Sequence, residues 1–560
     1  MKRSISTLGL LLTSLSAIIG SGWLFSAYYT ASLAGPGSLL AWLLGGVFAL
    51  IIAFVFAEVC ALLPLSGSST RIPQITHGTV VSFTFAWIIW LSYISIMAIE
   101  VQSVLQYASY YFPILTKSSG GLTRVGFLVA VILMLLISVI NVYSVRWLVR
   151  FNSFLTVLKL FVLLVIGVIV WWGARCLYGA PISQGGIHWV LTQPTGWFPL
   201  GAHGVFSALV SGGILFAFNG FKQAAEMAGE AKNPARAVPL AILGSVLISV
   251  LLFLFLQWGF LSSLNENNLK LGWHALVLPH QQSPWAAILS QNKQVIFLPI
   301  LYLGAIIAPL AAGLMYCSAA SRSLYGMAQG GYAPEFLGKL SAHHHPSSAI
   351  WVNFLIGLFL FLPLPGWNTM VSFMSSLLAM TYAIGPLSLI SLRYQLPKAK
   401  RPIRLPFVKL WGWAGFYICT LLAYWSGWET LWKMMVAIII GFLMLGIFYR
   451  AKKNKNKNKN KNKNIARDLD GLHGLHGLHD LHDLHWKGAV WLWPYLIGLC
   501  VFSYLGAFGG IEALSNFWEY FLQAVFSLII FILATHWSVP RATVEATLKK
   551  LSFSMGSNNF

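Results

Sequence analysis

The chain has 560 residues, of which 58% are hydrophobic and only 9% are charged. Soluble domains carry roughly 25% charged residues, so this composition excludes a soluble globular protein and indicates an integral membrane protein. The formal net charge of +22 would suit nucleic-acid binding only if the basic residues formed a soluble basic surface. They are instead concentrated between apolar runs, so we expect a lipid bilayer as the surroundings and no nucleic-acid partner.

Apolar runs of about 20 residues, the length of a helix that crosses a bilayer, recur along the whole chain. The runs are continuous and lack the alternating polarity of barrel strands, which favours helices. The sequence therefore predicts an all-α polytopic membrane protein with about 14 transmembrane helices. The expected spans are 7–33, 37–63, 81–111, 125–145, 151–172, 203–225, 236–262, 296–325, 348–365, 369–393, 408–427, 432–450, 488–508 and 517–537.

The basic residues also predict the orientation and the division of the chain. With the N-terminus inside, most lysines and arginines lie on the inner side, as the positive-inside rule requires. An even number of spans then places both termini in the cytoplasm. We expect a twelve-span core at 1–450, a low-complexity cytoplasmic linker at 451–487, two additional transmembrane helices at 488–537 and a cytoplasmic tail at 538–560.

The first span contains a break, because the sequence AIIGSGWLF places Gly20, Ser21 and Gly22 inside an apolar run. Glycine lets the backbone leave the helical path, and the freed N–H groups then need a partner, such as a bound anion, that lipid cannot provide. The sixth span is interrupted in the same way at 211–213 and 218–220. Matched breaks predict a transporter with inverted five-span repeats, at about 7–172 and 203–393. Close helix packing is the alternative reason for such glycines.

Charged residues inside the spans are few, and a charge at mid-bilayer costs about 2.5 to 3.5 kcal/mol, so it is usually functional or paired. Glu100 lies in the third span and Lys159 in the fifth, while Lys222 and Glu226 lie near the end of the sixth. These four residues are the candidates for ion or substrate chemistry.

Two histidine-rich segments suggest metal binding. The linker contains a three-residue repeat that is either a metal-binding or pH-sensing element or a simple-repeat expansion in a tolerant loop. A second group, His343 to His345, raises the alternative of a membrane metalloenzyme, but no other ligand set accompanies it on that face, and a solvated loop is favoured. We therefore expect no metal, no cofactor and no catalytic residue. The repeat histidines are His473, His476, His479, His482 and His485.

Several motifs resemble the amino acid–polyamine–organocation superfamily of permeases. They are AIIGSGWLF in the first span, FVFAEVCALLPLSG at 54–67, LFAFNGFKQAAEMAGEAKNPARAVPLAI at 215–242 and AASRSLYGMAQGGYAPEF at 319–336. Glu100 in the third span, PLPGWN, AYWSGWET and FSYLGAFG are similar to bacterial aspartate–proton symporters of this superfamily. The resemblance implies a LeuT-like 5+5 inverted-repeat fold with broken first and sixth helices, and a location in the bacterial inner membrane.

The resemblance also implies the substrate site. Ser21 and Gly22 would hold the substrate carboxylate, with Gly20 allowing the turn. The free carbonyls of Ile18, Phe216 and Asn219, at a second break that includes Gly220, would hold the ammonium, and Phe216 would also gate the site. The physics agrees, because helix N-termini favour carboxylates and the carbonyls of helix C-termini favour cations.

Lys159 matches a fifth-span lysine of sodium-independent relatives. Burial disfavours the charged form of a lysine, so Lys159 is a candidate proton carrier. The alternative is a permanently charged ammonium that is bonded to backbone carbonyls and holds the first span in place. Glu100 is a second proton candidate, and its alternative is a structural polar pair with a neighbouring helix.

Lys222 departs from the pattern, because many relatives have glutamate at this position. A cation there would favour an acidic substrate side chain or replace a proton-linked acid, or it would extend its side chain to water. The sequence therefore predicts proton-coupled uptake of a small amino acid by alternating access, with aspartate and glutamate as candidates. An amino acid or polyamine antiporter is the alternative.

Overall fold

The computed structural model describes residues 5–143, 145–178, 186–192, 196–278, 283–330, 332–341, 346–463 and 486–555. In these ranges the regular structure is helical, and the β contacts are two isolated bridges, Ile5 with Ala231 and Thr116 with Leu122. The predicted all-α class is confirmed.

The first five predicted spans contain α1 (Thr7–Ile18), α2 (Gly22–Ala34), α3 (Ser38–Leu62), α5 (Thr79–Ala108), α6 (Arg124–Tyr143) and α7 (Val145–Tyr178), with α4 (Ser68–His77) and α8 (Gly186–Leu191) as connecting helices. The next five contain α9 (Gly201–Val210), α10 (Ile214–Ala217), α11 (Lys222–Glu226), α12 (Pro234–Ser262), α14 (Leu298–Gln329), α15 (Ser347–Leu360) and α16 (Trp367–Gln395), with α13 (Pro284–Gln291) between α12 and α14. The chain continues through α17 (Val408–Trp425), α18 (Trp428–Lys463), α19 (Leu492–Leu505), α20 (Asn516–His536) and α21 (Arg541–Met555).

Each predicted apolar run contains a helix. Among the described residues, ten helical segments are long and apolar enough to cross a membrane, and three shorter apolar helices are Thr7–Ile18, Gly201–Ala217 and Ser347–Leu360. The protein is therefore a multi-pass membrane protein, while the count of fourteen spans stays a prediction.

Helix boundaries fall at residues whose backbone preferences end or start a helix. Gly35 (φ +58°) follows α2, and Gly78 (φ +88°) separates α4 from α5. These positive φ angles favour glycine. Pro234 begins α12, where its missing N–H group leaves no helical hydrogen bond unmade.

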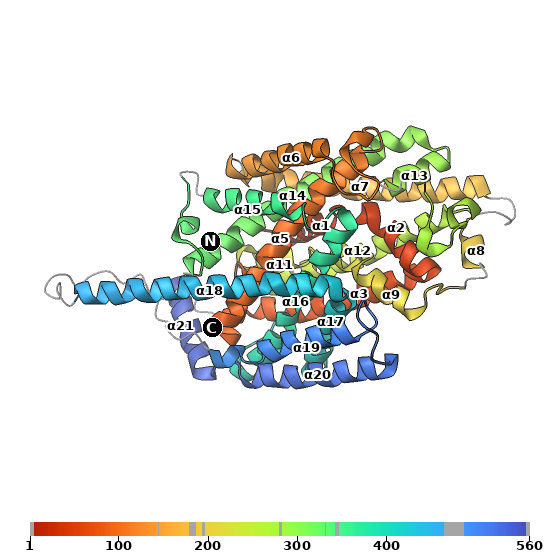
Figure 1. Ribbon diagram of the computed structural model, residues 1–560. Coiled ribbons are helices and arrows are strands. Elements are labelled where there is room, and N and C mark those ends of the chain that lie inside the picture. The colour runs from red at the N-terminus through yellow and green to blue at the C-terminus, as the bar shows by residue number, and fades with distance from the viewer. Residues whose placement is uncertain are drawn as a thin grey trace.

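The centre of the molecule is formed by α5 and α16. The most apolar windows of these helices are 89% and 100% buried, respectively, and the two helices pack against each other. The α14 helix packs on α5, α12 packs on α3, and α1 packs on α12 and α7. Figure 1 shows α6 and α7 at one edge of the molecule and α19 and α20 at the opposite edge, with α1 between these edges.

The two helices after the linker pack on α17. Trp413 Nε1 donates a hydrogen bond to Ser527 Oγ (3.2 Å). Tyr417 donates its hydroxyl to the Tyr520 carbonyl (3.2 Å), and Trp425 Nε1 donates to the Tyr520 hydroxyl (3.4 Å). Polar groups of α17 are thereby satisfied by α20 inside an otherwise apolar contact.

The segment before α21 contacts the ends of α4 and α16. The Val539 N–H donates to the Thr76 carbonyl (2.8 Å). Gln395 Nε2 donates to the carbonyls of both Thr76 (3.0 Å) and Val539 (2.8 Å). We refer to these three residues as the C-terminal clamp.

Candidate functional site

The first span is broken between α1 and α2, as predicted. The α1 helix ends at Ile18, α2 begins at Gly22, and the Ile18 carbonyl accepts a bond from the Gly20 N–H (3.0 Å). Ser21 precedes α2 and makes no side-chain cap to its first turn. The break therefore brings the carbonyl end of α1 close to the N–H end of α2, and these ends carry opposite partial charges.

The sixth span is broken twice, which also confirms the prediction. The first break, at 211–213, separates α9 from α10, and the second, at 218–221, separates α10 from α11. Gly213 has φ +87°, a conformation that favours glycine. The short α10 helix consequently lies between two irregular segments, with its backbone close to the first span.

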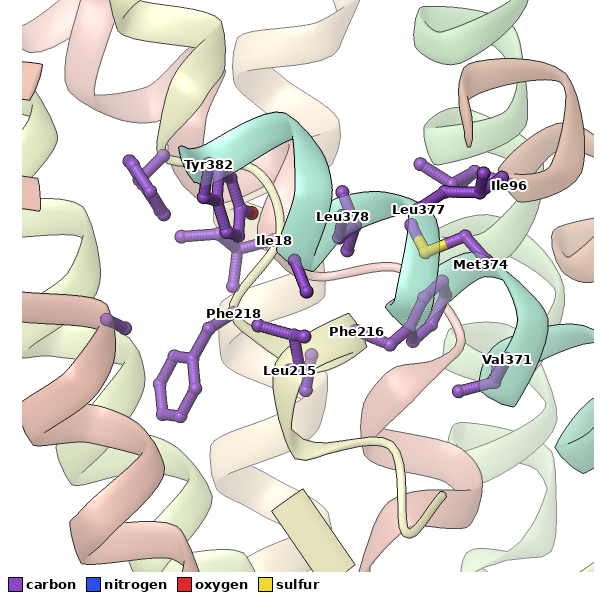
Figure 2. Packing of buried hydrophobic residues seen from close by; sticks show 14 of the residues in the cluster. Ile18, Ile96, Leu215, Phe216, Phe218, Val371, Met374, Leu377, Leu378 and Tyr382 are labelled. Carbon is purple, nitrogen blue, oxygen red and sulfur yellow. The ribbon is translucent and has the colours of Figure 1, made fainter. Parts of the chain in front are cut away.

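The breaks in the two spans touch each other through glycines. A Cβ atom on Gly220 would collide with backbone atoms of Ala17 and Ile18, and one on Gly22 would lie 3.1 Å from the Cα and Cβ atoms of Ala217. Only residues without a side chain allow these backbone contacts. Figure 2 shows that apolar side chains around the breaks, including Ile18 and Phe216, belong to one buried cluster with residues of α16.

Glu100 and Lys159 both lie at the first break. Lys159 is 1% exposed, and its Nζ atom donates to the carbonyls of Ser16 (3.2 Å) and Ile19 (3.1 Å) and to the Ser16 hydroxyl (3.3 Å). The Glu100 carboxyl group packs against Gly20 and interacts with Ser21 and electrostatically with Lys159. Two predicted residues, an acidic one from α5 and a basic one from α7, thus lie beside the break.

Asn219 connects the sixth span to two tyrosines that the sequence analysis missed. Asn219 Nδ2 donates to the Tyr316 hydroxyl (3.0 Å), and the Tyr382 hydroxyl donates to Asn219 Oδ1 (3.1 Å). The Tyr316 hydroxyl also lies 3.4 Å from the Ala17 carbonyl, which it can donate to. Both ends of the amide are therefore satisfied, and the network reaches the end of α1.

Trp367 is a further residue that sequence reasoning did not assign. Its Nε1 atom donates to the Ser21 hydroxyl (2.9 Å), and its ring stacks on Phe25 and Tyr29 at centroid distances of 4.8 and 5.7 Å. Phe216 packs its ring perpendicular to the Trp367 ring at 5.7 Å. The only local signal is the Pro-Gly pair that precedes this tryptophan at the start of α16.

Lys222 begins α11, three residues after Asn219. It is 4% exposed, and its ammonium lies 5.2 Å from the Tyr382 ring centroid and 5.5 Å from the Phe56 ring centroid. The side chain is therefore buried under aromatic rings rather than extended toward water. Tyr382 links it to the break, because the same residue also binds Asn219.

An apolar pocket lies beside this site. It is lined by residues of α3, α10 and α17, among them Ala49, Ile214 and Leu422, and Tyr382 also contributes. Its lining includes none of the residues predicted to bind the substrate. An apolar lining does not suit a zwitterion, so this pocket is not the candidate site.

The histidines that suggested metal chemistry, His343 to His345 and the linker repeat from His473 to His485, lie outside the described residues. Over the part of the chain that the structure describes, there is no group of three or more histidine, cysteine, aspartate or glutamate side chains that could hold a metal ion.

Broken apolar helices that meet backbone to backbone, with buried charges beside them, define a membrane transporter. Comparison with known families makes this class specific: the amino acid permease profile matches residues 9–465, and the chain belongs to this family. The protein is accordingly a transporter and not an enzyme. The predicted superfamily is confirmed.

Individual relatives extend over nearly the whole chain. The glutamate/serine transporter AimA of Bacillus subtilis (strain 168) is 30% identical over 545 residues, which cover 95% of this chain and 94% of the relative. The aspartate-proton symporter of the same organism is 29% identical over 549 residues, or 97% and 98% of the two chains. The branched-chain amino acid permease BcaP of the same organism is 25% identical over 475 residues, which cover 80% of this chain and 94% of the relative.

Proposed function

We propose that this amino acid transporter is a proton-coupled permease that imports a small amino acid across the bacterial inner membrane, with aspartate and glutamate as candidate substrates. The observation that carries the proposal is the contact between the two broken spans, where Gly22 meets Ala217 and Gly220 meets Ile18. The relatives described above, a glutamate/serine transporter and an aspartate-proton symporter, support the choice of substrates.

The two charges of an α-amino acid fit opposite ends of the breaks. The substrate carboxylate would bind the first-turn N–H groups of α2 at Ser21 and Gly22, which the Ser21 side chain does not cap. It would displace the Glu100 carboxyl group, which interacts with the Ser21 backbone. The carbonyls of Ile18 and Phe216 each accept one backbone bond, from Gly20 and Asn219 respectively. A carbonyl oxygen has two lone pairs, so each could accept a second bond from the substrate ammonium.

The remaining ammonium contact would come from the Asn219 carbonyl. Phe216 would act as the gate, since its ring packs on Trp367, which in turn binds Ser21. Alternating access would then move the broken first and sixth spans relative to α5 and α16, which form the enclosed centre.

Proton coupling would involve Lys159 and Glu100. Lys159 binds the carbonyl end of α1, and Glu100 packs at the start of α2, so a change of charge on either residue would alter the break directly. The same hydrogen bonds also fit the alternative role of Lys159, a permanent charge that holds α1 in place. Loss of proton coupling without loss of exchange would distinguish the first role from the second.

The proposed orientation has both termini in the cytoplasm. The permease core would comprise residues 1–450, with inverted repeats at about 7–172 and 203–393, and the linker, the two additional helices and the tail would follow at 451–487, 488–537 and 538–560. The positive-inside rule supports this orientation. Labelling of single introduced cysteines from either side of intact cells tests it.

The decisive experiment is uptake of labelled aspartate, glutamate and serine into proteoliposomes with and without an inward proton gradient. We expect the gradient to drive accumulation of at least one acidic amino acid above its equilibrium level. Uptake that ignores the gradient and needs an amino acid inside the vesicles would instead establish the antiporter.

A further inference from the structure

Lys222 and Glu226 form a second buried charge arrangement on α11, separate from Lys159 and Glu100. They are four residues apart and so lie on the same face of the helix. Within the described chain the Lys222 ammonium has neither a salt-bridge nor a hydrogen-bond partner, and its neighbours are the rings of Phe56 and Tyr382. A buried cation without an acceptor is costly unless an anion binds it.

Glu226 is the anionic residue that balances Lys222 at a distance. The two side chains interact electrostatically but are not in salt-bridge contact. The Oε1 atom of Glu226 is buried without a hydrogen-bond partner, while the carboxyl group also interacts with the side chain and backbone of Ser69. The residue as a whole is half-buried.

The charged residues on the other elements around this pair do not interact with it. Tyr93 on α5 and Cys60 on α3 interact with Glu226, and Cys60 and Cys419 on α17 interact with Lys222. The α1 helix contains no titratable residue, and Arg236 of α12 is exposed. Charged residues also occur on the other elements that pack on α11: Arg71 on α4, Glu58 on α3 and Glu230. None of these three is an electrostatic partner of Lys222 or Glu226, and Glu58 is paired with Arg393 and Arg401. The buried arrangement therefore holds one potential cation and one potential anion.

The arrangement is connected to the substrate site through Tyr382. Its ring lies against the Lys222 ammonium, and its hydroxyl donates to Asn219 at the break. An amino acid bound at the break, with its side chain directed toward α11, would therefore present that side chain to Lys222. A side-chain carboxylate would supply the missing acceptor, whereas a serine hydroxyl would not supply a charge.

The side-chain carboxylate of an acidic substrate would add a third charge to Lys222 and Glu226, and one proton would balance it. With Lys222 protonated and Glu226 ionised, an added carboxylate leaves one net negative charge in a buried region, which is unfavourable. If Glu226 takes up one proton, the net charge is the same before and after binding. When the substrate leaves, Glu226 releases the proton and again balances Lys222.

We propose that Lys222 binds the side-chain carboxylate of acidic amino acids and that Glu226 carries one additional proton with each of them. This inference rests on the proposed function, because it requires an acidic substrate at the break. It predicts a difference between substrates: acidic amino acids move with one proton more than neutral ones, so both kinds of substrate carry the same net charge across the membrane.

The test counts protons per substrate in proteoliposomes that contain a pH-sensitive dye, with labelled aspartate and labelled serine. For the wild-type protein we expect one more proton per aspartate than per serine. For Glu226→Gln we expect equal numbers. For Lys222→Met we expect aspartate uptake to fall at least about tenfold, because a buried charge contact is lost, while serine uptake changes less than about twofold.

Glu230→Gln is the matched control, because Glu230 is the next acidic residue and does not interact with Lys222. This variant should keep the wild-type difference between aspartate and serine. Aspartate exchange between the two sides of the membrane should persist in Glu226→Gln, because exchange needs no net proton movement, and this measurement confirms that the variant is folded.

Three results would overturn the inference while leaving the proposed permease intact. The first is an equal proton count for aspartate and serine in the wild-type protein, which needs no variant. The second is a Glu226→Gln protein that keeps the difference, and the third is a Lys222→Met protein that transports aspartate as well as serine. Wild-type protein that shows no gradient-driven uptake of any amino acid would contradict the proposed function instead.

Discussion

The two broken spans differ in the groups that bind their irregular segments. At the first break, the Lys159 ammonium donates to two carbonyls and a hydroxyl, and the Glu100 carboxyl group lies beside it. At the second, neutral groups satisfy Asn219, and the nearby Lys222 ammonium has only aromatic faces. The first break is thus held by a cation whose donors are satisfied, whereas the second leaves a cation available to a ligand.

A side chain placed between the two breaks should have the largest effect on uptake. In Gly22→Leu, a bulky side chain meets Ala217 and Phe216, which lie 3.1 and 3.4 Å from an added Cβ atom. We expect uptake to be abolished, measured with labelled amino acid at equal membrane abundance. Gly446→Leu is the control, since no atom lies near an added Cβ there. Wild-type uptake by Gly22→Leu would remove the proposed carboxylate site.

Removing the cation at the first break should have the next largest effect. Lys159→Met leaves two buried carbonyls without a donor and removes the cation that interacts electrostatically with Glu100. Each unsatisfied buried acceptor costs about 1–3 kcal/mol. We expect gradient-driven accumulation to fall by about 100-fold or more.

Lys270→Met, which changes an exposed lysine, is the control for Lys159→Met. A Lys159→Met protein that still accumulates substrate with the gradient would show that the first break does not need this charge for coupling. Exchange that persists while accumulation is lost would favour Lys159 as a proton carrier over a purely structural ammonium.

Loss of a neutral hydrogen bond at the second break should reduce transport less than loss of Lys159. Tyr382→Phe removes the hydroxyl that donates to Asn219 Oδ1 but keeps the ring that faces Lys222. The loss of one neutral hydrogen bond, about 0.5–1.5 kcal/mol, should raise KM by about three- to tenfold. Concentration-dependent uptake measures this change. An effect as large as that of Lys159→Met would contradict the contrast between the two breaks.

His77 provides a pH dependence that belongs to neither break and should leave uptake at neutral pH unchanged. Burial lowers the pKa of this histidine from 6.5 to about 3, so the folded protein keeps it neutral while the unfolded chain binds a proton below about pH 6.5. Stability should therefore be constant above about pH 6.5 and fall as the pH drops from there toward 3, by up to about 1.4 kcal/mol per pH unit.

Thermal unfolding in detergent between pH 8 and pH 5 measures the contribution of His77. We expect the slope of stability below about pH 6.5 to be smaller in His77→Gln than in the wild-type protein. An unchanged slope would place the acid sensitivity in other groups, such as the carboxyl groups near the breaks. This comparison separates loss of the fold at low pH from proton coupling.

The sequence predicts the spans and the breaks because their signals are local. Apolar runs mark the helices, and the glycines at 20, 22, 213 and 220 mark the places where backbones must bend or meet. Lys159 and Glu100 could be selected because charges inside apolar runs are rare. Their meeting at the first break follows from packing between α1, α5 and α7, which no local pattern encodes.

The aromatic partners of the breaks could not be predicted in the same way. Trp367 is 346 positions from Ser21 along the chain, and Tyr382 is 163 positions from Asn219. Aromatic residues are common in this sequence, which has 24 tryptophans and 20 tyrosines. Single members are therefore not distinctive until the fold brings them to the site. The burial of Lys222 also depends on such partners, since Tyr382 and Phe56 come from α16 and α3.

The C-terminal clamp and the contacts of α20 change how the family match should be used. The match ends at residue 465, but a protein shortened to that point would lose Val539 from the clamp and the partners of Trp413, Tyr417 and Trp425. Those indole and phenol groups would then face lipid, which offers no acceptor. The smallest unit suitable for purification therefore extends at least through Val539, and an affinity tag belongs beyond that residue rather than at the end of the matched region.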